Sequence, residues 1–371
     1  MLKDYMGVIS LSEDESNIRS LTVHRPIASI PIFARYRVID FMLSNMKNAG
    51  ITNVGIFVNS ASRSLIDHIG TGKPWDMNRK NDGVFIFNRY LNAAVNNDIK
   101  LLKNNLEFLY RSKKNKVIMT SSYMICNMDF EEIAYEHEKS DADVTVVYKK
   151  VENGDNMFLN CDTLKIDENG RVLSVGRNLC LTDTANVSME IYIMNKEFFI
   201  DCILRCIQDG GCDTIKQYIF ANLKKFDVRA YEYKGYVGCI NSVNSYYRVS
   251  MDILEYNVMN ELLNSNRRIY TKSNDSPPTK YLNGSEIVNS LIANGCVIKG
   301  TVKNSIISRG VVIEEGAEVI NSIVFPKCVI NKNVKLKNVI LDKNVEIEMD
   351  KVLIGDKNYP VVIEKGSYVG I

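Results

Sequence analysis

The chain has 371 residues, which is long enough for two domains that each have their own core. Lysine and arginine number 46 and aspartate and glutamate 44, so the formal net charge of +2 excludes a broad basic surface and argues against nucleic acid as the main partner. The sequence has no apolar run long enough for a membrane span and no N-terminal signal-peptide pattern. We therefore expect a cytoplasmic protein without a membrane partner.

The nine cysteines are an odd number spread along the chain. Cys202, Cys206 and Cys212 come closest to a cluster, but no C-x-x-C pair occurs. This spacing does not predict a zinc site. We expect the cysteines to be reduced thiols, mostly buried, as is usual in a cytoplasmic protein.

The first part of the chain alternates between strand and helix patterns. Residues Met6 to Leu11 predict a short buried strand that leads into a loop. Segment 37–50 has the spacing of a helix and ends at Gly50, a typical C-cap residue. Three more apolar, β-branched runs predict strands at Val54–Ser60, Lys116–Ser122 and Asp143–Lys150. This alternation favours an α/β, Rossmann-like domain with a mostly parallel sheet covered by helices.

Two later segments predict helices, and a third predicts a linker. Segment 97–115 is amphipathic and ends in basic residues, which suits the negative end of a helix dipole. Segment 250–266 has helical spacing and is predicted to close the first domain. The polar stretch that follows contains Pro277 and Pro278. We therefore expect a first domain over 1–264, a linker over 265–284 and a second domain over 285–371.

After the linker the sequence becomes repetitive. Four similar stretches start about seventeen residues apart, at Asn289, Asn304, Asn321 and Asn338. Within them, aliphatic residues recur in rows with a period of six, such as Ile307, Ile313, Val319, Phe325 and Val311, Ala317, Ile323, Val329. This period, with Gly or Asn at the corners, predicts a left-handed parallel β-helix of hexapeptide repeats. The alternative is an antiparallel β-sandwich, which would not require repeats in phase.

An α/β domain, a proline-containing linker and a hexapeptide β-helix together resemble the sugar-1-phosphate nucleotidyltransferases. The resemblance is strongest to ADP-glucose pyrophosphorylase (glucose-1-phosphate adenylyltransferase) of bacterial glycogen synthesis. Its most specific part is RYRVIDFMLSNMKNAGITNVGIF, because that family has a very similar R-I-I-D-F-x-L-S-N block. Two further matches are SMEIYIMNKEFF, which resembles the family's S-M-G-I-Y-V-F block, and SPPTKY, which resembles the start of its β-helix. The resemblance covers nearly the whole chain and implies a nucleotidyltransferase-like first domain.

The loop after the first strand departs from the family. Active members carry G-G-x-G-x-R-L there, with backbone amides that bind triphosphate and an arginine that neutralises pyrophosphate. This chain keeps Arg19 but has no glycine between Leu11 and Leu21, and the loop starts at Ser12 with the letters SEDES. Its carboxylates would repel phosphate in a partly desolvated pocket. Residues other than glycine also resist the close backbone approach that phosphate binding requires.

Other family positions that contact phosphate or metal are also changed. Ile27 begins the stretch that aligns with the family's K-P, so the resemblance implies the loss of a phosphate-binding lysine. Ser122 or Tyr123 takes the place of the strand-end aspartate that holds Mg²⁺, and Cys239 takes the place of the second metal aspartate. Because Mg²⁺ prefers anionic oxygen ligands, we expect neither a metal site nor a cofactor. We also expect no catalytic residue in this chain.

A basic group and one amide remain as candidates for ligand binding. The resemblance implies an anionic effector, such as a phosphorylated sugar or a nucleotide, at His24, Arg25, Arg35 and Arg37. The alternative is a solvated or internally paired basic patch. Asn59 falls where relatives place a glutamine that reads the adenine edge, and its alternative role is in a turn at a strand end.

The pattern of losses matches one branch of the family, the non-catalytic, D-type regulatory subunits that accompany a catalytic subunit. We therefore expect a catalytically degenerate subunit that modulates the catalytic subunit of ADP-glucose pyrophosphorylase, as part of a hetero-tetramer. One alternative is an active sugar-1-phosphate nucleotidyltransferase with an altered site, which the two missing metal carboxylates disfavour. A second is an acyltransferase with a histidine base near the β-helix, but the three histidines His24, His68 and His137 all precede the linker.

Overall fold

The structure is a computed structural model that describes residues 1–59, 62–79, 82–88, 98–152 and 156–370. Their contacts define two compact units. Unit 1 comprises Met1–Asp14, Ile39–Val237 and Asn266–Tyr270, and unit 2 comprises Glu15–Val38, Gly238–Ser265 and Thr271–Ile371. The domain boundaries expected from the sequence follow chain order, whereas these units follow contacts and combine segments that are distant in the sequence.

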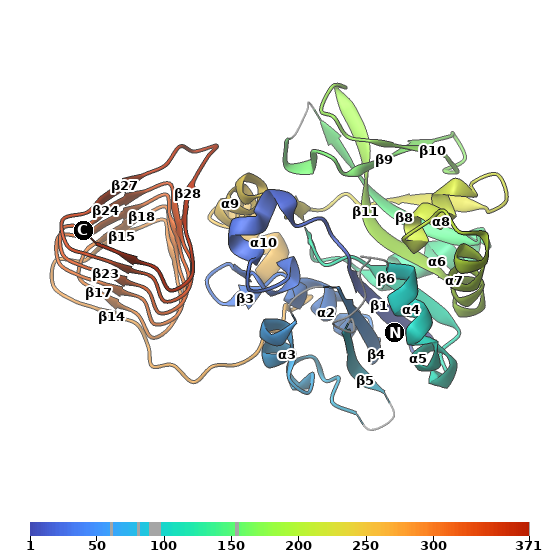
Figure 1. Ribbon diagram of the computed structural model, residues 1–371, viewed down its shortest axis with the longest axis horizontal. Coiled ribbons are helices and arrows are strands. Elements are labelled where there is room, and N and C mark those ends of the chain that lie inside the picture. The colour runs from blue at the N-terminus through green and yellow to red at the C-terminus, as the bar shows by residue number, and fades with distance from the viewer. Residues whose placement is uncertain (60–61, 80–81, 89–97, 153–155, 371) are drawn as a thin grey trace. The chain divides into compact units, whose positions relative to one another are not determined.

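Unit 1 is built on a sheet with the order β10-β9-β11-β6-β1-β4-β5, and β8 pairs with both β11 and β12 (Figure 1). Neighbouring strands among β1, β4, β5 and β6 pair in parallel, as the strand-helix alternation predicts. β11 runs antiparallel to β6 and β8, so the sheet is mixed. The strands are β1 (Tyr5–Leu11), β4 (Asn53–Val58), β5 (Gly83–Asn88), β6 (Lys116–Thr120), β8 (Val144–Glu152), β9 (Asp162–Ile166), β10 (Val172–Arg177), β11 (Thr184–Asn195) and β12 (Val228–Glu232).

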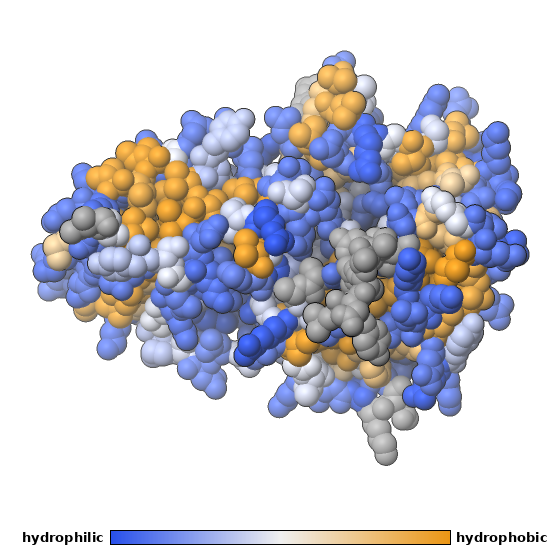
Figure 2. Space-filling view, in the orientation of Figure 1, coloured by the Kyte–Doolittle hydropathy of each residue, from blue (hydrophilic) through white to orange (hydrophobic). Residues whose placement is uncertain are grey.

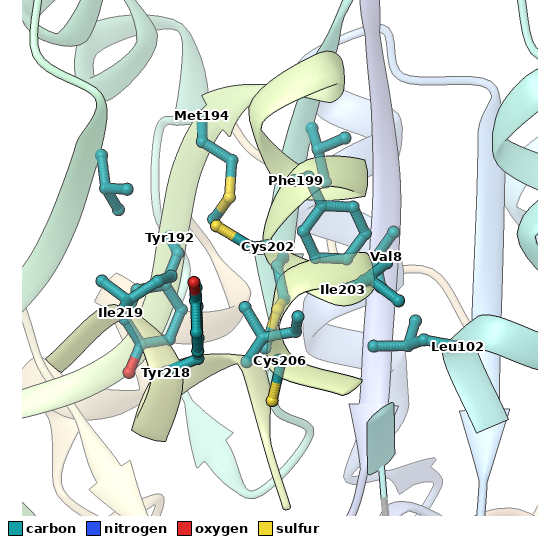
Figure 3. Close-up of a cluster of buried hydrophobic side chains, with 14 of the residues drawn as sticks. Val8, Leu102, Tyr192, Met194, Phe199, Cys202, Ile203, Cys206, Tyr218 and Ile219 are labelled. Carbon is teal, nitrogen blue, oxygen red and sulfur yellow. The ribbon is translucent and has the colours of Figure 1, made fainter. Parts of the chain in front are cut away.

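The helices of unit 1 are α2 (Ile39–Asn48), α3 (Arg63–Ile69), α4 (Asp98–Asn104), α5 (Leu106–Arg111), α6 (Phe130–Ser140), α7 (Lys196–Asp209) and α8 (Ile215–Ala221). Helix α2 lies in the segment predicted from its spacing, and Gly50 follows its end with φ of 82°. Helix α7 packs on β6 and β11 as well as on α4 and α8. Their apolar side chains form a core that includes Val8, Leu102, Met194, Phe199 and Ile219 (Figure 3).

The single helix predicted over 97–115 is wrong. The described part of this segment forms two helices, α4 and α5, because Asn105 leaves the helical region with φ of −121° and ψ of 21°. Its side-chain nitrogen donates to the carbonyl oxygen of Leu101 at 2.8 Å, which satisfies an acceptor at the end of α4. Residue 97, and Ser60 of the strand predicted at Val54–Ser60, lie outside the described residues.

Unit 2 contains two helices where the sequence predicts one over 250–266. Helix α9 (Val243–Asp252) begins earlier, at a capping box between Ser242 and Ser245, and α10 (Tyr256–Leu263) follows it. The prediction is wrong because Glu255 is extended, with φ of −77° and ψ of 127°, and ends the continuous helical backbone. The shorter elements of this unit are α1 (Arg19–Thr22), β2 (Pro31–Ile32), β3 (Tyr36–Arg37) and β13 (Gly238–Cys239).

The repeats of unit 2 form a parallel β-helix with three sheets, consistent with the predicted left-handed coil (Figure 1). One sheet contains β14 (Lys280–Tyr281), β17 (Val297–Ile298), β20 (Val312–Ile313), β23 (Val329–Ile330), β26 (Glu346–Ile347) and β29 (Tyr368–Val369). The second contains β15 (Glu286–Val288), β18 (Thr301–Lys303), β21 (Glu318–Ile320), β24 (Lys335–Lys337) and β27 (Val352–Ile354). The third contains β16 (Leu291–Ile292), β19 (Ile306–Ile307), β22 (Ile323–Val324), β25 (Val339–Leu341) and β28 (Val361–Ile363).

The corners of the coils explain the Asn-Ser pairs in the repeats. Asn304 and Asn321 have φ of 47° and 46°, in the left-handed region that asparagine tolerates. The serine after each corner bridges coils, because Ser322 N donates to the hydroxyl oxygen of Ser305 at 3.0 Å. Such local chemistry recurs once per coil, which is why the repeats are visible in the sequence.

In the row Ile307, Ile313, Val319, Phe325, the prediction that every residue faces the inside of the coil is wrong for Phe325. Ile307 pairs with Val324, which lies in the β-helix core, seventeen residues further along the chain. One side of the coil is therefore shorter than six residues, and this shifts the phase. Phe325 is also buried, but its ring packs against Tyr246 of α9, with the ring centroids 6.1 Å apart. The hexapeptide period thus predicts the coil but not which side of it each apolar residue occupies.

Among the described helices, none is both long and apolar enough to cross a membrane. The nine cysteines are free thiols, and most of them are buried.

Candidate functional site

The loop after β1 places a carboxylate of the protein itself at the end of β6. Glu13 Oε1 accepts hydrogen bonds from the backbone nitrogen of Ser122 at 2.8 Å and from the Ser122 hydroxyl at 2.9 Å. Glu13 is partly buried, and this burial raises the pKa of its carboxyl group to about 7. The negative charge of Glu190 adds to the increase. Two donors at the carboxyl end of a parallel strand, a place where ligands bind in α/β sheets, are therefore taken by an internal anion.

A second carboxylate lies near the same strands. Asp98, at the start of α4, is 2% exposed and accepts a hydrogen bond from the Ser10 hydroxyl at 2.8 Å. Burial raises the pKa of its carboxyl group to about 6. The charge of Glu190 contributes to this increase, and the charge of Lys216 opposes it. The negative charge of Glu190 therefore raises the pKa of both Asp98 and Glu13.

Lys216 of α8 is the cation between Asp162 and Glu190, and the more exposed Arg177 guanidinium also lies 3.5 Å from Asp162. Its Nζ donates to Asp162 Oδ2 at 2.9 Å and to Glu190 Oε1. Burial alone would lower the pKa of Lys216, but the charges of Glu190 and Asp162 raise it. Glu190 lies in an irregular part of β11 with φ of 53°. We call Glu13, Asp98, Asp162, Glu190 and Lys216 the acidic cluster.

The acidic cluster has more carboxylates than cations, and its groups are hydrogen-bonded to one another or to nearby serines. An entering phosphate would meet like charge in a partly desolvated place, where repulsion is strong. Within the described ranges, no group of three His, Cys, Asp or Glu side chains is arranged to hold a metal ion. The geometry therefore supplies hydrogen-bonded carboxylates rather than a cradle for phosphate.

The other residues of unit 1 predicted for the pocket lie as follows. The Ser12 hydroxyl is 3.1 Å from the Ser10 hydroxyl, and the Ser12 side chain is exposed. Tyr123 is 8% exposed, next to the Glu13-bound Ser122. Asn59 is half-buried directly after β4. Glu13, Ser12 and Ser122 thus lie around the ends of β1 and β6, whereas Asn59 lies after β4, which pairs with β1 on its other side.

The predicted pocket residues of unit 2 are Arg19, Ile27 and Cys239. Arg19 is exposed in α1, and its guanidinium lies 4.0 Å from the Glu15 carboxylate. Ile27 is buried, and its backbone nitrogen donates to Glu15 Oε1 at 3.2 Å. Cys239 is fully buried in β13. Glu15 therefore has a structural role, because it links two turns of segment 15–38.

The predicted anion-binding residues separate into buried and exposed members. Arg25 is 3% exposed, and its Nη2 donates to Asp342 at 2.8 Å (Oδ1) and 2.5 Å (Oδ2). Its guanidinium also lies 5.9 Å from the ring centroid of Phe325. His24 and Arg35 are exposed, and the Arg35 guanidinium lies 5.1 Å from the ring centroid of Tyr36. The guanidinium of Arg25 is therefore already paired with an internal carboxylate.

More cations surround the Arg25–Asp342 pair. The pKa of Lys343 is lowered to about 7, mainly by burial and also by the charges of Arg37 and Arg25. Lys365 also lowers this pKa and lines a small depression together with His24, Arg25 and Asp342. We call Arg25, Arg37, Asp342, Lys343 and Lys365 the basic cluster.

Sequence reasoning missed most members of both clusters. Asp98, Asp162 and Lys216 come from separate elements, and the adjacent Asp342 and Lys343 lie in one loop after β25 that carries no motif. One signal was present, since Glu190 occupies the position of glycine in the block that resembles S-M-G-I-Y. A charged residue at a position with positive φ is uncommon, and it could have marked this part of β11.

Comparisons with known proteins agree with this architecture. The nucleotidyl transferase family matches residues 16–254, and the GlmU-like, C-terminal hexapeptide family matches residues 277–359. The glycogen biosynthesis protein GlgD of Bacillus subtilis (strain 168) is 33% identical over 98% of this chain and 97% of the relative. GlgD of Geobacillus stearothermophilus is 35% identical, with the same two coverages. A glucose-1-phosphate adenylyltransferase of Bacillus mycoides (strain KBAB4) is 29% identical over 94% of each chain. The chain therefore belongs to the nucleotidyl transferase family, in its ADP-glucose pyrophosphorylase group and close to GlgD.

Proposed function

We propose that this chain is a catalytically degenerate, regulatory subunit of ADP-glucose pyrophosphorylase, which converts ATP and glucose 1-phosphate to ADP-glucose and pyrophosphate in glycogen biosynthesis. The names of its relatives, which match it over nearly their full length, support a role in glycogen synthesis. The degenerate status rests on the residues of this chain itself.

The observation that carries the proposal is the hydrogen bonding of Glu13 to Ser122. The family resemblance implies that Glu13 comes from the loop that cradles phosphate in an active relative, and that Ser122 or Tyr123 takes the place of the aspartate that holds Mg²⁺ there. Here Glu13 Oε1 accepts from both donor groups of Ser122, so an internal carboxylate takes their hydrogen bonds. Phosphoryl transfer depends on positioning and on cation charge at the phosphates, and the acidic cluster has the opposite charge. We accordingly assign no metal or other cofactor to this chain.

We propose that the β-helix carries the contact with the catalytic subunit, in a cytoplasmic hetero-tetramer. Figure 2 shows apolar side chains gathered on the visible face of the β-helix. On the sheet formed by β15, β18, β21, β24 and β27, the side chains of Val288, Val352 and Ile354 are 46%, 56% and 64% exposed. Val288 lies on one edge strand of this sheet, and Val352 and Ile354 lie together on the opposite edge strand, β27. An exposed aliphatic pair of this kind is a feature of protein interfaces.

A phosphorylated effector remains part of the proposal. Arg25 is buried and paired with Asp342, whereas His24 and Arg35 are exposed and Arg37 is half-buried, so His24 and Arg35 are the most accessible members of the predicted group. A guanidinium and an imidazole together can form charge-assisted hydrogen bonds to phosphate.

The first test is a steady-state assay of ADP-glucose formation by the purified chain and by the catalytic subunit from the same cell. We expect the chain alone to be at least a hundredfold slower than a typical enzyme, whose turnover is about 10 per second. Adding the chain to the catalytic subunit should cause a saturable change in maximal rate or half-saturation. Turnover of the chain alone close to the typical value would instead favour an active nucleotidyltransferase with an altered site.

The second test separates the surfaces. Val352→Asp with Ile354→Asp should weaken binding to the catalytic subunit, because it places charge in an apolar contact. Leu181→Asp is the matched control, since Leu181 is 84% exposed in unit 1. The double variant His24→Ala, Arg35→Ala should bind normally but blunt the response to phosphorylated effectors. Equal binding by all variants would show that the β-helix sheet is not the interface.

A further inference from the structure

Two cysteines meet where α7 ends. Cys206 lies in the last turn of this helix, and Cys212 follows it after Gly210 and Gly211. Gly210 N donates to the carbonyl oxygen of Cys206 at 3.1 Å, and the two glycines have φ of 69° and 80°. These conformations, which glycine adopts easily, turn the chain back toward the helix. As a result, the Cys206 thiol donates to the carbonyl oxygen of Cys212 at 3.3 Å.

The two thiols differ in access to solvent. Cys206 is 1% exposed, and burial raises the pKa of its thiol to about 11. Its sulfur lies 3.3 Å from the carbonyl oxygen of Cys212, so the Cys206 thiol is held beside the residue that carries the second thiol. Cys212 is half-buried, so a small oxidant in solution reaches it before it reaches Cys206.

We propose that Cys206 and Cys212 form a reversible intramolecular disulfide, with a small disulfide such as oxidised glutathione as the oxidant. The Cys212 thiolate attacks one sulfur of oxidised glutathione, forms a mixed disulfide and releases one glutathione thiolate. Cys206 loses its proton to water, attacks the Cys212 sulfur and releases the second glutathione thiolate. Two cysteine thiols are thereby oxidised and one glutathione disulfide is reduced to two thiols, so electrons and protons balance.

The turn that this disulfide closes is connected to the acidic cluster. Ile99 N, next to Asp98, donates to the carbonyl oxygen of Asp213 at 3.3 Å. Thr214 caps α8, the helix that carries Lys216, by accepting a hydrogen bond from Gln217 N at 3.3 Å. A covalent link at Cys212 restrains the residue directly before Asp213. Oxidation therefore rigidifies the starts of α4 and α8, which hold one carboxylate and the lysine of the cluster.

Cys202 provides a comparison inside the same helix. It lies one turn before Cys206, where both side chains enter the core of unit 1 (Figure 3). Burial raises the pKa of the Cys202 thiol to about 12, and the side chain is 1% exposed. Side chains four residues apart lie on the same face of a helix, so Cys202 is the competing partner for Cys206, and the test has to distinguish it from Cys212.

The test treats the reduced full-length chain with millimolar oxidised glutathione, blocks the remaining thiols with iodoacetamide under denaturing conditions and digests it with trypsin. Cleavage after Arg205 and Lys216 produces one peptide, 206–216, that holds both cysteines, whereas Cys202 lies in peptide 197–205. We expect peptide 206–216 to be unalkylated and two hydrogen atoms lighter, while peptide 197–205 is alkylated. Dithiothreitol should reverse the change in peptide 206–216.

Two variants control the result. Cys202→Ser should leave the disulfide unchanged, and Cys212→Ser should leave Cys206 alkylated. The proposal is overturned if glutathione stays on Cys212 while Cys206 is alkylated, or if Cys202 is the residue that pairs. Hydrogen exchange of the oxidised protein should be slower at the starts of α4 and α8, and unchanged exchange at both would overturn the connection to the acidic cluster.

Discussion

The acidic cluster of unit 1 and the basic cluster of unit 2 have opposite imbalances of charge. In the first, several carboxylates surround Lys216, and in the second, several cations surround Asp342. Burial raises the pKa of Glu13 to about 7 in the first and lowers the pKa of Lys343 to about 7 in the second. Each cluster contains a paired ion of the minority sign, Lys216 in the first and Asp342 in the second, and removing that ion should reveal the difference between them.

The largest effect should come from Asp342→Asn in the basic cluster. Arg25 would stay buried without its counter-ion, beside further cations, which costs about 3–5 kcal/mol of unfolding free energy. The measurement is urea denaturation followed by circular dichroism. Asp350→Asn, at an exposed corner of the same β-helix, should change the free energy by less than about 0.5 kcal/mol.

The double variant Arg25→Met, Asp342→Leu tests whether the loss of stability comes from an unpaired buried charge or from any change at these two positions. Because it removes both ions together, it should recover most of the stability that Asp342→Asn loses. If Asp342→Asn is no less stable than Asp350→Asn, Asp342 is not the ion on which the basic cluster depends.

A smaller effect should follow Lys216→Met in the acidic cluster. The loss should be about 2 kcal/mol, because Lys216 is 23% exposed and water screens part of the remaining repulsion. It should be larger at pH 8 than at pH 5, since Glu13 and Asp98, with pKa values of about 7 and 6, are then ionised. Lys299→Met, which removes a more exposed ion pair with Glu314, should cost no more than about 1 kcal/mol. A loss that is the same at both pH values would contradict this reading.

Glu13→Gln should remove a pH dependence of the wild-type protein. The folded state raises the Glu13 pKa from 4.5 to about 7, so the wild type binds this proton more tightly when folded and loses stability as pH rises through that range. The variant keeps an acceptor for Ser122. It should gain about 1–2 kcal/mol relative to the wild type between pH 5 and pH 8, in urea denaturation. Asp183→Asn, at an exposed position, should show no such gain.

Lys343→Met should remove a pH dependence of the opposite sign, with the smallest effect. The folded state lowers the Lys343 pKa from 10.5 to about 7, so the unfolded chain binds this proton more tightly and the wild type gains stability as pH rises from 7 to 10.5. The variant should be about 1 kcal/mol more stable than the wild type at pH 7, and this advantage should shrink by pH 9.5. If the stability advantage of Lys343→Met over the wild type grew with pH, the two clusters would not have pH dependences of opposite sign.

The parts of the fold that could be predicted are those in which the cause is local. Asparagine at the corners and aliphatic residues inside each coil recur with the coil, so the β-helix is visible before any contact is known. The parallel strands of unit 1 are likewise continuous apolar runs between helical segments. Phe325 was misplaced because a six-residue side and a shorter side of the coil have the same composition.

The breaks in two helices could not be predicted because their causes are specific conformations. Asn105 ends α4 through a side-chain hydrogen bond to Leu101, and asparagine within an amphipathic pattern is not by itself a stop signal. The extended backbone at Glu255 has the same effect between α9 and α10. The amphipathic pattern of such a segment indicates helix along its whole length. A single residue with a non-helical backbone does not interrupt that pattern, so the break is not visible in the sequence.

The amino-acid sequence by itself determines the repeat, the alternation of strands and helices, and the carboxylates in the loop where a phosphate cradle would lie. It names Glu13 and Ser122 separately, but their hydrogen bond exists only because β1 and β6 are neighbours in the sheet. Only the tertiary structure joins Glu190 to Lys216, and Arg25 to an aspartate 317 positions away. A charge acquires its counter-ion and its pKa from neighbours in space, and folding brings these together from elements that share no local pattern.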